Sequence, residues 1–352
     1  MNNISNFKKQ ILNFPELWKY TNPKEFKNSN DKFIPKNKNL DFQTDKNQII
    51  IYNGSIINIA NNLNNYIKIK SKYSIKVKKN TSLDNPIYIK HYINEGDKNL
   101  FLNYKLKFEI GKNSNLKIVN QEIFSINQCI KIDFDLLLDN NSNLNLINHS
   151  EKPETKQLLN FSAKLNKNAK LAIHPIDING KLIKNNYFIY LNKQGSECSF
   201  NGFSLLNKKE HIDNYIEIYH NSQYTISRLN YNSITKGHSK NILFAKAIIQ
   251  KDSSNSEAYQ KNNNLMLSST SIIHSNPQLE IYNNDVKCTH GSTTGQIDEE
   301  AIFYMKSRGI KDSTAKRILI SGFLNDIINT IKINDIKKYF LEKIDCYLED
   351  VN

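Results

Sequence analysis

The sequence has little cysteine, because its 352 residues include only Cys129, Cys198, Cys288 and Cys346. These four residues are scattered and form no CxxC pair. This spacing excludes a disulfide framework and a zinc site built from paired cysteines, so we interpret the thiols as reduced.

Glycine and proline are also scarce, with 11 and 7 residues, and no glycine spacing completes a phosphate-binding loop. The sequence contains neither a Gly-x-Ser-x-Gly elbow nor an HExxH motif. Without a nucleophile motif or a cofactor loop, we expect a protein that is not an enzyme.

Long hydrophobic runs are missing too, since no apolar run approaches the roughly 18 residues of a membrane span. The start, "MNNISNFKKQILNF", lacks the apolar region of a signal peptide and the Arg/Ser-rich character of a transit peptide. We therefore expect a cytoplasmic protein, with a plastid stroma as the alternative.

The net charge of +14 raises the question of an anionic partner. However, Asn, Lys and Ile are abundant throughout, and A/T-rich codons encode these residues, so the excess of Lys fits an A/T-rich bacterial genome. Aromatic residues are not interleaved with Arg in any patch. We predict neither a nucleic-acid partner nor a membrane partner.

A repeat of about 27 residues runs through the middle of the chain. Its copies are "GKNSNLKI" at 111–118, "DNNSNLNL" at 139–146, "NKNAKLAI" at 166–173 and "NKQGSECSF" at 192–200. Each copy has a polar turn and then alternating apolar residues, which aligns Leu116, Leu144, Leu171 and Cys198. A degraded copy follows with Tyr224 and Ile226, and an earlier one ends at Ile89.

Between the copies lies a second set of segments with period-two alternation, such as "YKLKFEI" and "IKIDFDLLL". Two strands per repeat, joined by Asn-rich turns, predict a mainly β fold in which residues 76–295 form a β-solenoid. Asn suits these turns because it tolerates positive φ. The end coils of such a stack are sheet edges that must be capped or paired.

The flanks have a different pattern. Residues 1–75 form a partly helical N-terminal region, with helical patches around "FKKQILNFPELW", and residues 296–352 form a C-terminal helical domain. Asp298 is a natural N-cap and Gly309 a helix stop. Two amphipathic stripes follow, which pack on a neighbour or bind a partner; they comprise Leu319, Phe323, Ile327, Ile331 and Ile336, Phe340, Ile344.

The segment "LEIYNNDVKCTHGSTTGQIDEEAIFYMKSRGI" at 279–310 closely resembles the signature of the SufB/SufD family of iron-sulfur cluster assembly proteins. The runs "SEAYQKNNNLMLS" at 256–268 and "FPELWKYTN" at 14–22 also resemble family motifs. A SufB-like sequence would carry a glutamate after the histidine, whereas Gly291 follows His290 here. The resemblance is therefore strongest to the SufD branch.

This resemblance implies a right-handed parallel β-helix between helical ends. It also implies a scaffold that pairs with a SufB-like subunit through the β-helix and docks a SufC-like ATPase through the C-terminal helices. A transient iron-sulfur cluster would form at the partner interface, and none would be stably bound to the isolated chain. The alternatives are a SufB-like cluster scaffold or an unrelated cytoplasmic β-solenoid binding module.

His290 matches the family position that faces the partner and helps to hold the nascent cluster, and a neutral imidazole suits iron. The alternative is a structural histidine in a tight turn. Cys288 would share a face with His290 on a strand, so it is a second candidate metal ligand, or else a buried core residue. We expect Gly291 and Gly295 to form a turn with positive φ.

Overall fold

Strands dominate the computed structural model, which describes residues 15–26, 44–92, 101–123, 129–151 and 155–349. The strands are β1 (Gln48–Tyr52), β2 (Ser55–Ile59), β3 (Ile67–Ser71), β4 (Ser74–Val77), β5 (Ile87–Tyr92), β6 (Phe101–Ile110), β7 (Asn115–Ile123), β8 (Cys129–Leu138), β9 (Asn143–Glu151), β10 (Lys156–Leu165), β11 (Lys170–Ile178), β12 (Leu182–Leu191), β13 (Glu197–Leu206), β14 (His211–His220), β15 (Ile226–Thr235), β16 (Lys240–Ile249), β17 (Ser256–Met266), β18 (Ile272–Ile281) and β19 (Val286–Gln296).

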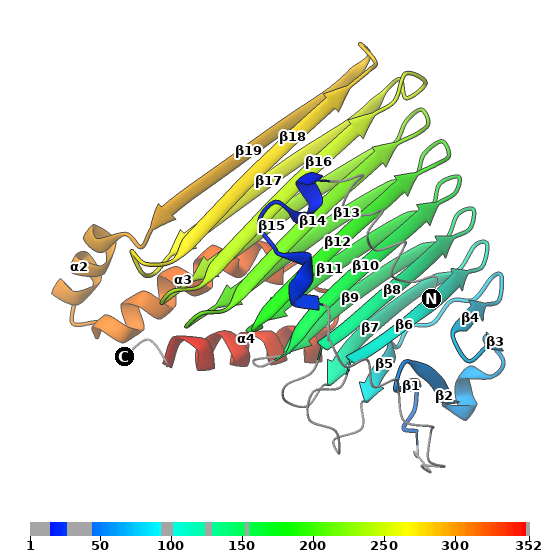
Figure 1. The fold of residues 1–352 in the computed structure, drawn as a ribbon, viewed down its shortest axis with the longest axis horizontal. Helices are drawn as coiled ribbons and strands as arrows, with labels where there is room; N and C mark the ends of the chain where they lie inside the picture. Colours follow the sequence, from blue (N-terminus) through cyan, green and yellow to red (C-terminus); the bar gives the residue numbers. More distant parts are fainter. Residues whose placement is uncertain (1–14, 27–43, 93–100, 124–128, 152–154, 350–352) are drawn as a thin grey trace.

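These strands form two sheets, with one strand of each coil in either sheet (Figure 1). Sheet A has the order β19-β17-β15-β13-β11-β9-β7-β5-β1-β2, and sheet B has the order β18-β16-β14-β12-β10-β8-β6-β4-β3. Neighbouring strands are parallel except for the hairpins β1-β2 and β3-β4, which lie at the N-terminal end of the stack. The predicted parallel β-solenoid is confirmed, with about seven turns.

The register confirms the repeat read from the sequence. Leu144 pairs with both Leu116 and Leu171, and Leu171 pairs with Cys198. All four side chains are buried in the core between the sheets. The next copy was misaligned, because the partner of Cys198 is Ser227, not Tyr224 or Ile226. This coil is two residues longer than the one before it.

Asparagines hold the turns at one corner of the solenoid. Asn113, Asn141 and Asn168 have φ of 56°, 55° and 53°, as the composition of the turns predicted. Their side chains also bond along the axis: the Asn141 amide donates to Asn113 Oδ1 at 3.0 Å, and the Asn168 amide donates to Asn141 Oδ1 at 3.2 Å. The same residue type therefore satisfies the backbone conformation and links adjacent coils.

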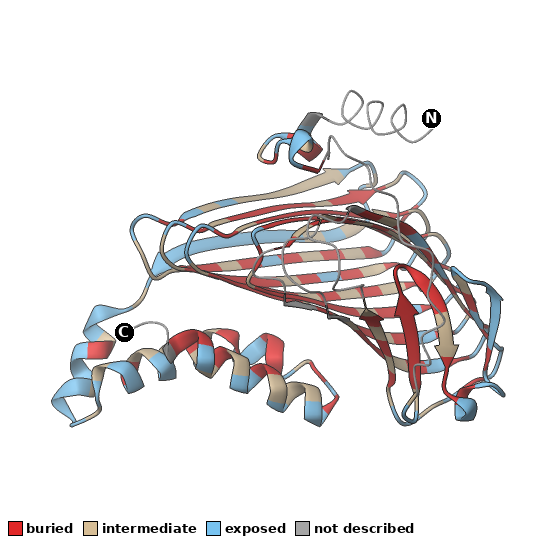
Figure 2. Ribbon diagram, turned by 60° about the horizontal axis from the view of Figure 1, so that its bottom comes forward, coloured by how far each residue is buried: buried red, intermediate tan, exposed pale blue. Residues whose placement is uncertain are grey.

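The C-terminal helices are α2 (Glu299–Ser307), α3 (Asp312–Ile328) and α4 (Asn334–Glu349). The last two cover the outer face of sheet A, where their buried side chains form one apolar cluster with outward residues of β7 to β17. Figure 2 shows their buried face turned toward the sheet and their exposed face toward solvent. None of the helices within the described ranges is long and apolar enough to cross a membrane.

The apolar stripe predicted from Leu319 to Ile331 is confirmed in part. Leu319 and Phe323 are only half-buried, whereas Ile320, Leu324 and Ile328 are fully buried. A spacing of four residues drifts around a helix that has 3.6 residues per turn, so the predicted stripe meets the sheet only at its C-terminal end, where Ile327 and Ile331 are buried. The stripe of α4 is confirmed, with Phe340 and Ile344 buried and Ile336 half-buried.

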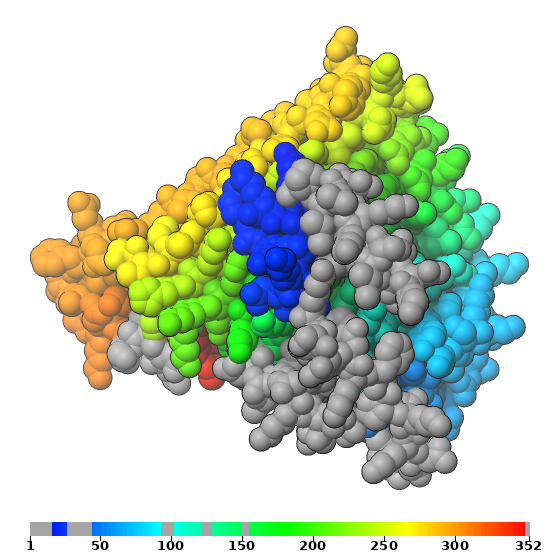
Figure 3. All heavy atoms as spheres, viewed as in Figure 1, coloured from blue at the N-terminus to red at the C-terminus, as the bar shows by residue number. Residues whose placement is uncertain are grey.

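Residues 15–26, called the strap below, lie across the outer face of sheet B, opposite the helices (Figures 1 and 3). They contain two short 3-10 helices, η1 (Pro15–Trp18) and η2 (Pro23–Phe26). A third 3-10 helix, η3 (Asn61–Leu63), lies between β2 and β3. Leu17, Trp18 and Phe26 pack with apolar residues of β10 to β16. The rest of the helical patch predicted at the N-terminus lies outside the described residues.

Candidate functional site

The candidate residues lie on the last coil of the solenoid, formed by β18 and β19. Each of these strands pairs on one side only within the described chain, β18 with β16 and β19 with β17. We call this edge, where the interior of the solenoid opens, the open end. Most side chains along β19 are exposed, because no further coil covers them.

The glycines next to the candidate histidine do not form the predicted turn. Gly291 and Gly295 lie inside the extended strand β19, and neither has a positive φ. A Cβ atom added at either position would meet nothing within 4 Å. The prediction was wrong because the chain continues straight along the edge of sheet A until Gln296.

Alternate residues of β19 face the interior and stack on the interior residues of β17. Cys288 pairs with Ala258, His290 with Gln260 and Ser292 with Asn262. Because side chains two residues apart on a strand share a face, Cys288 and His290 lie on the same side of β19. The open end is therefore lined by a column of residues with ligating and hydrogen-bonding groups.

Cys288 is half-buried and contacts an apolar cluster that contains Ala247, Ile249 and Ala258. Burial raises the pKa of its thiol, and the backbone N–H of Ala258 partly offsets this effect. The thiol is thus mainly protonated in the isolated chain at neutral pH, and a bound metal would have to displace its proton. The His290 side chain is exposed.

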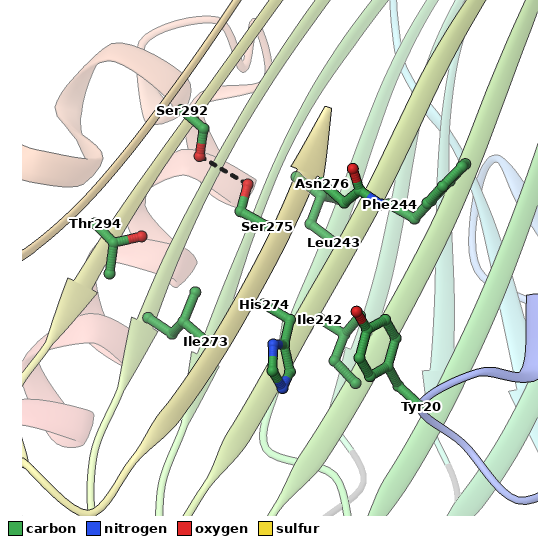
Figure 4. Close-up of a pocket in the computed structure, with 10 residues that line it drawn as sticks. All are labelled: Tyr20, Ile242, Leu243, Phe244, Ile273, His274, Ser275, Asn276, Ser292 and Thr294. Atoms are coloured by element: carbon green, nitrogen blue, oxygen red, sulfur yellow. Dashed lines mark hydrogen bonds between the residues drawn. The ribbon is translucent and has the colours of Figure 1, made fainter. Parts of the chain in front are cut away.

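A cavity of about 380 Å³ adjoins this column at the open end (Figure 4). On its inner side Ser275 of β18 and Ser292 of β19 share a hydrogen bond of 2.7 Å, and Ser275 donates to Asn262 Oδ1 at 2.6 Å. These contacts link the two sheets across the interior. Sequence reasoning missed them, because nothing in the local sequence shows that β17, β18 and β19 meet at this point.

On the outer side of the cavity, His274 of β18 stacks on Tyr20 of the strap, with ring centroids 4.7 Å apart (Figure 4). Burial lowers the pKa of His274, as do the nearby charges of Lys240 and Lys19. No motif in the sequence singles out His274. The strap therefore reaches the edge strand of sheet B and contributes to the surface beside the open end.

The other cysteines do not join the site. Cys198 is buried in the core, as its place in the repeat indicated, while Cys129 lies half-buried near the strap and Cys346 is exposed on α4. Across residues 15–26, 44–92, 101–123, 129–151 and 155–349, no group of three or more His, Cys, Asp or Glu side chains could hold a metal ion.

Beyond β19 the chain enters α2, whose start is as predicted. The Asp298 side chain accepts a hydrogen bond of 3.0 Å from the Ala301 N–H, so it caps the helix, and Gly309 follows with φ of 84°.

Two aromatic side chains of α2 face solvent, since Phe303 is 74% exposed and Tyr304 is 60% exposed. Two large aromatic side chains of this helix are thus accessible at the surface.

Comparisons with known proteins identify relatives of this chain. The family model "SUF system FeS cluster assembly, SufBD core domain" matches residues 88–323, about two thirds of the chain. The iron-sulfur cluster assembly protein SufD of Escherichia coli is 29% identical over 171 residues, which cover 49% of this chain and 40% of the relative. A SufBD family protein of Synechocystis is 24% identical over 180 residues, covering 51% and 40%. The matched segments thus span less than half the length of these relatives.

Proposed function

Because the chain belongs to the SufBD family of SUF-system iron-sulfur cluster assembly proteins, we propose that it is a SufD-like scaffold subunit without catalytic activity of its own. In this role it pairs with a SufB-like subunit and docks a SufC-like ATPase. The iron-sulfur cluster is cargo, which forms transiently at the contact between the two scaffold chains.

The observation that carries this proposal is the open end. At the N-terminal end the sheets finish in β2 and β3, the outer strands of two antiparallel hairpins, whereas at the other end β18 and β19 continue the parallel stack and each offer an unpaired edge within the described residues. An exposed strand edge is a template for pairing with another chain. A homologous solenoid has the same strand spacing, so it suits both sheets at once and would bury the row of β19 side chains.

His290 and Cys288 supply two donors at this edge. Iron bound by nitrogen and sulfur ligands in a four-coordinate site needs more donors than one His and one Cys provide. The partner chain would supply the remaining ligands, so the isolated chain should hold no stable cluster. His290→Ala should fold normally and assemble, because the side chain is exposed, but the cluster yield of the complex should fall.

Co-expression with SufB-like and SufC-like proteins, followed by sizing of the purified material, tests the scaffold role. We expect one complex that contains all three chains. If this chain elutes alone while the other two are present and folded, the scaffold proposal is wrong. A His290→Ala complex that forms clusters at the unmodified level would show that His290 is structural.

The exposed aromatic residues of α2 support a docking role for the C-terminal region. Removing residues 312–352 would not test this role cleanly, because α3 and α4 cover apolar residues of sheet A. The sharper test replaces Phe303 and Tyr304 with Ser, with Leu341→Ser as the control on the exposed face of α4. Loss of ATPase binding only in the α2 variant is expected, and equal binding by both variants would contradict docking through α2.

A further inference from the structure

The interior residue beneath His290 has an unused hydrogen-bonding group. Gln260 of β17 is only 7% exposed, and it pairs in register with His290. Within the part of the chain that the structure describes, its Oε1 atom has no hydrogen-bond partner. A buried acceptor without a partner is costly, because it has lost water and gained nothing in return.

The orientation of the Gln260 amide is fixed by its other end. The Nε2 group donates a hydrogen bond of 3.2 Å to the backbone carbonyl of Gln278, on β18 across the interior. A flipped amide would place two oxygen atoms against each other at this contact, so Oε1 must point elsewhere. The contact also confirms that Gln260 faces the interior of the solenoid.

Of the two residues paired in register with Gln260, one can donate to this oxygen. The residue paired with Gln260 on the side of β15 is Leu229, which is apolar and buried. The residue on the other side is His290, one strand spacing away at about 4.8 Å. A ring nitrogen of His290 can reach hydrogen-bond distance from Oε1 by a change of side-chain rotamer.

We propose that Gln260 is a positioning residue for His290. When a partner covers the open end and excludes water, Oε1 accepts a hydrogen bond from one imidazole N–H of His290. This bond fixes the tautomer and the ring orientation and leaves the other nitrogen free to bind iron. The inference rests on the function proposed above, because it assigns a role to Gln260 through His290.

Two variants separate positioning from simple structural support. Gln260→Glu keeps the side-chain shape and an oxygen that can accept from His290, but it replaces the N–H at the Gln278 carbonyl with a carboxyl oxygen, which can donate there only when protonated. Gln260→Leu loses both groups. If Gln260 positions His290, the Leu variant should lower the cluster yield of the assembled complex by about 10-fold or more, as is usual for groups that orient metal ligands. The Glu variant should retain most of the yield.

The result that would overturn the inference is an equal loss in both variants, which would assign the effect to the bond with Gln278. Unchanged yield in the Leu variant would overturn it as well. If His290→Ala lowers the yield and Gln260→Leu does not, the proposed function stands and only the role of Gln260 fails. If His290→Ala has no effect, the function of the site itself is wrong.

A double variant and a structure give further readouts. Gln260→Leu combined with His290→Ala should yield no less cluster than His290→Ala alone, because the two residues act as one unit. A crystal structure of the assembled pair should place Gln260 Oε1 within about 3.2 Å of a His290 ring nitrogen. An additive loss in the double variant, or an Oε1 atom turned away from the ring, would contradict positioning.

Discussion

Buried histidines should make the solenoid sensitive to acid, and His220 at the end of β14 allows the effect to be isolated. This side chain is fully buried, and its ring nitrogens lie 2.8 Å from Thr225 Oγ1 and 2.8 Å from Ser227 Oγ. The Thr225 hydroxyl donates to the Ser222 carbonyl, so Nδ1–H of a neutral ring donates to Thr225 and Nε2 accepts from Ser227. Burial lowers the pKa of His220 to about 4.

The direction of the pH effect follows from this shift. The unfolded chain binds the proton near pH 6.5, whereas the folded chain resists it until about pH 4. The contribution of His220 to stability is therefore complete above pH 6.5 and is lost as the pH falls toward 4. At pH 5 the loss amounts to about 2 kcal/mol relative to pH 8.

Urea unfolding at pH 8 and pH 5 measures this loss directly. The free energy of unfolding of His220→Gln should fall about 2 kcal/mol less between the two pH values than that of the parent protein. His238→Gln, at an exposed histidine, controls for the removal of one imidazole from the unfolded chain. If His220→Gln and the parent lose stability equally over this range, the buried ring is not the source of acid sensitivity.

Substitutions at three positions test the corner, the helical cover and the strap. Asn141→Ala should be less stable than Asn141→Gly by about 1 kcal/mol in urea unfolding, since both variants lose the side-chain ladder but only Ala is strained at φ of 55°; equal stability would contradict the strain. Phe340→Ala should destabilise the docking of α4 by about 3 kcal/mol or more, so limited proteolysis should cut first within residues 334–349, and first cleavage elsewhere would refute this. Thr21→Val removes a hydrogen bond of 2.6 Å to buried Asp213, which should speed hydrogen exchange in residues 15–26, whereas unchanged exchange would mean that the other contacts, such as the Lys156–Glu25 ion pair and the apolar side chains, hold the strap.

The register of the solenoid could be predicted because each coil repeats the same apolar positions. Leu116, Leu144, Leu171 and Cys198 are separated by 28, 27 and 27 residues, and they pair as this spacing requires. The prediction failed at Ser227, where the coil becomes longer and the polar residue gives no apolar signal. A change in coil length is visible only when the strands are seen side by side.

The candidate site shows the same limit. His290 and Cys288 could be identified from a motif that is continuous in the sequence. Gln260 could not, because its pairing with His290 depends on a coil of 30 residues, a length different from the repeat that the sequence revealed. Gly291 was assigned to a turn because glycine often has positive φ, but glycine also tolerates an extended edge strand.

The most direct test of the scaffold role is hydrogen exchange across residues 272–296, measured on the isolated chain and on the chain mixed with a SufB-like partner. Pairing through the open end would give the unpaired edges of β18 and β19 hydrogen-bond partners, so amide exchange in this segment should slow markedly in the mixture. Strands far from the edge, such as β12, should exchange at the same rate in both samples. A complex that forms while exchange in β18 and β19 stays unchanged would show that the partner binds elsewhere, and the account of the open end would be wrong.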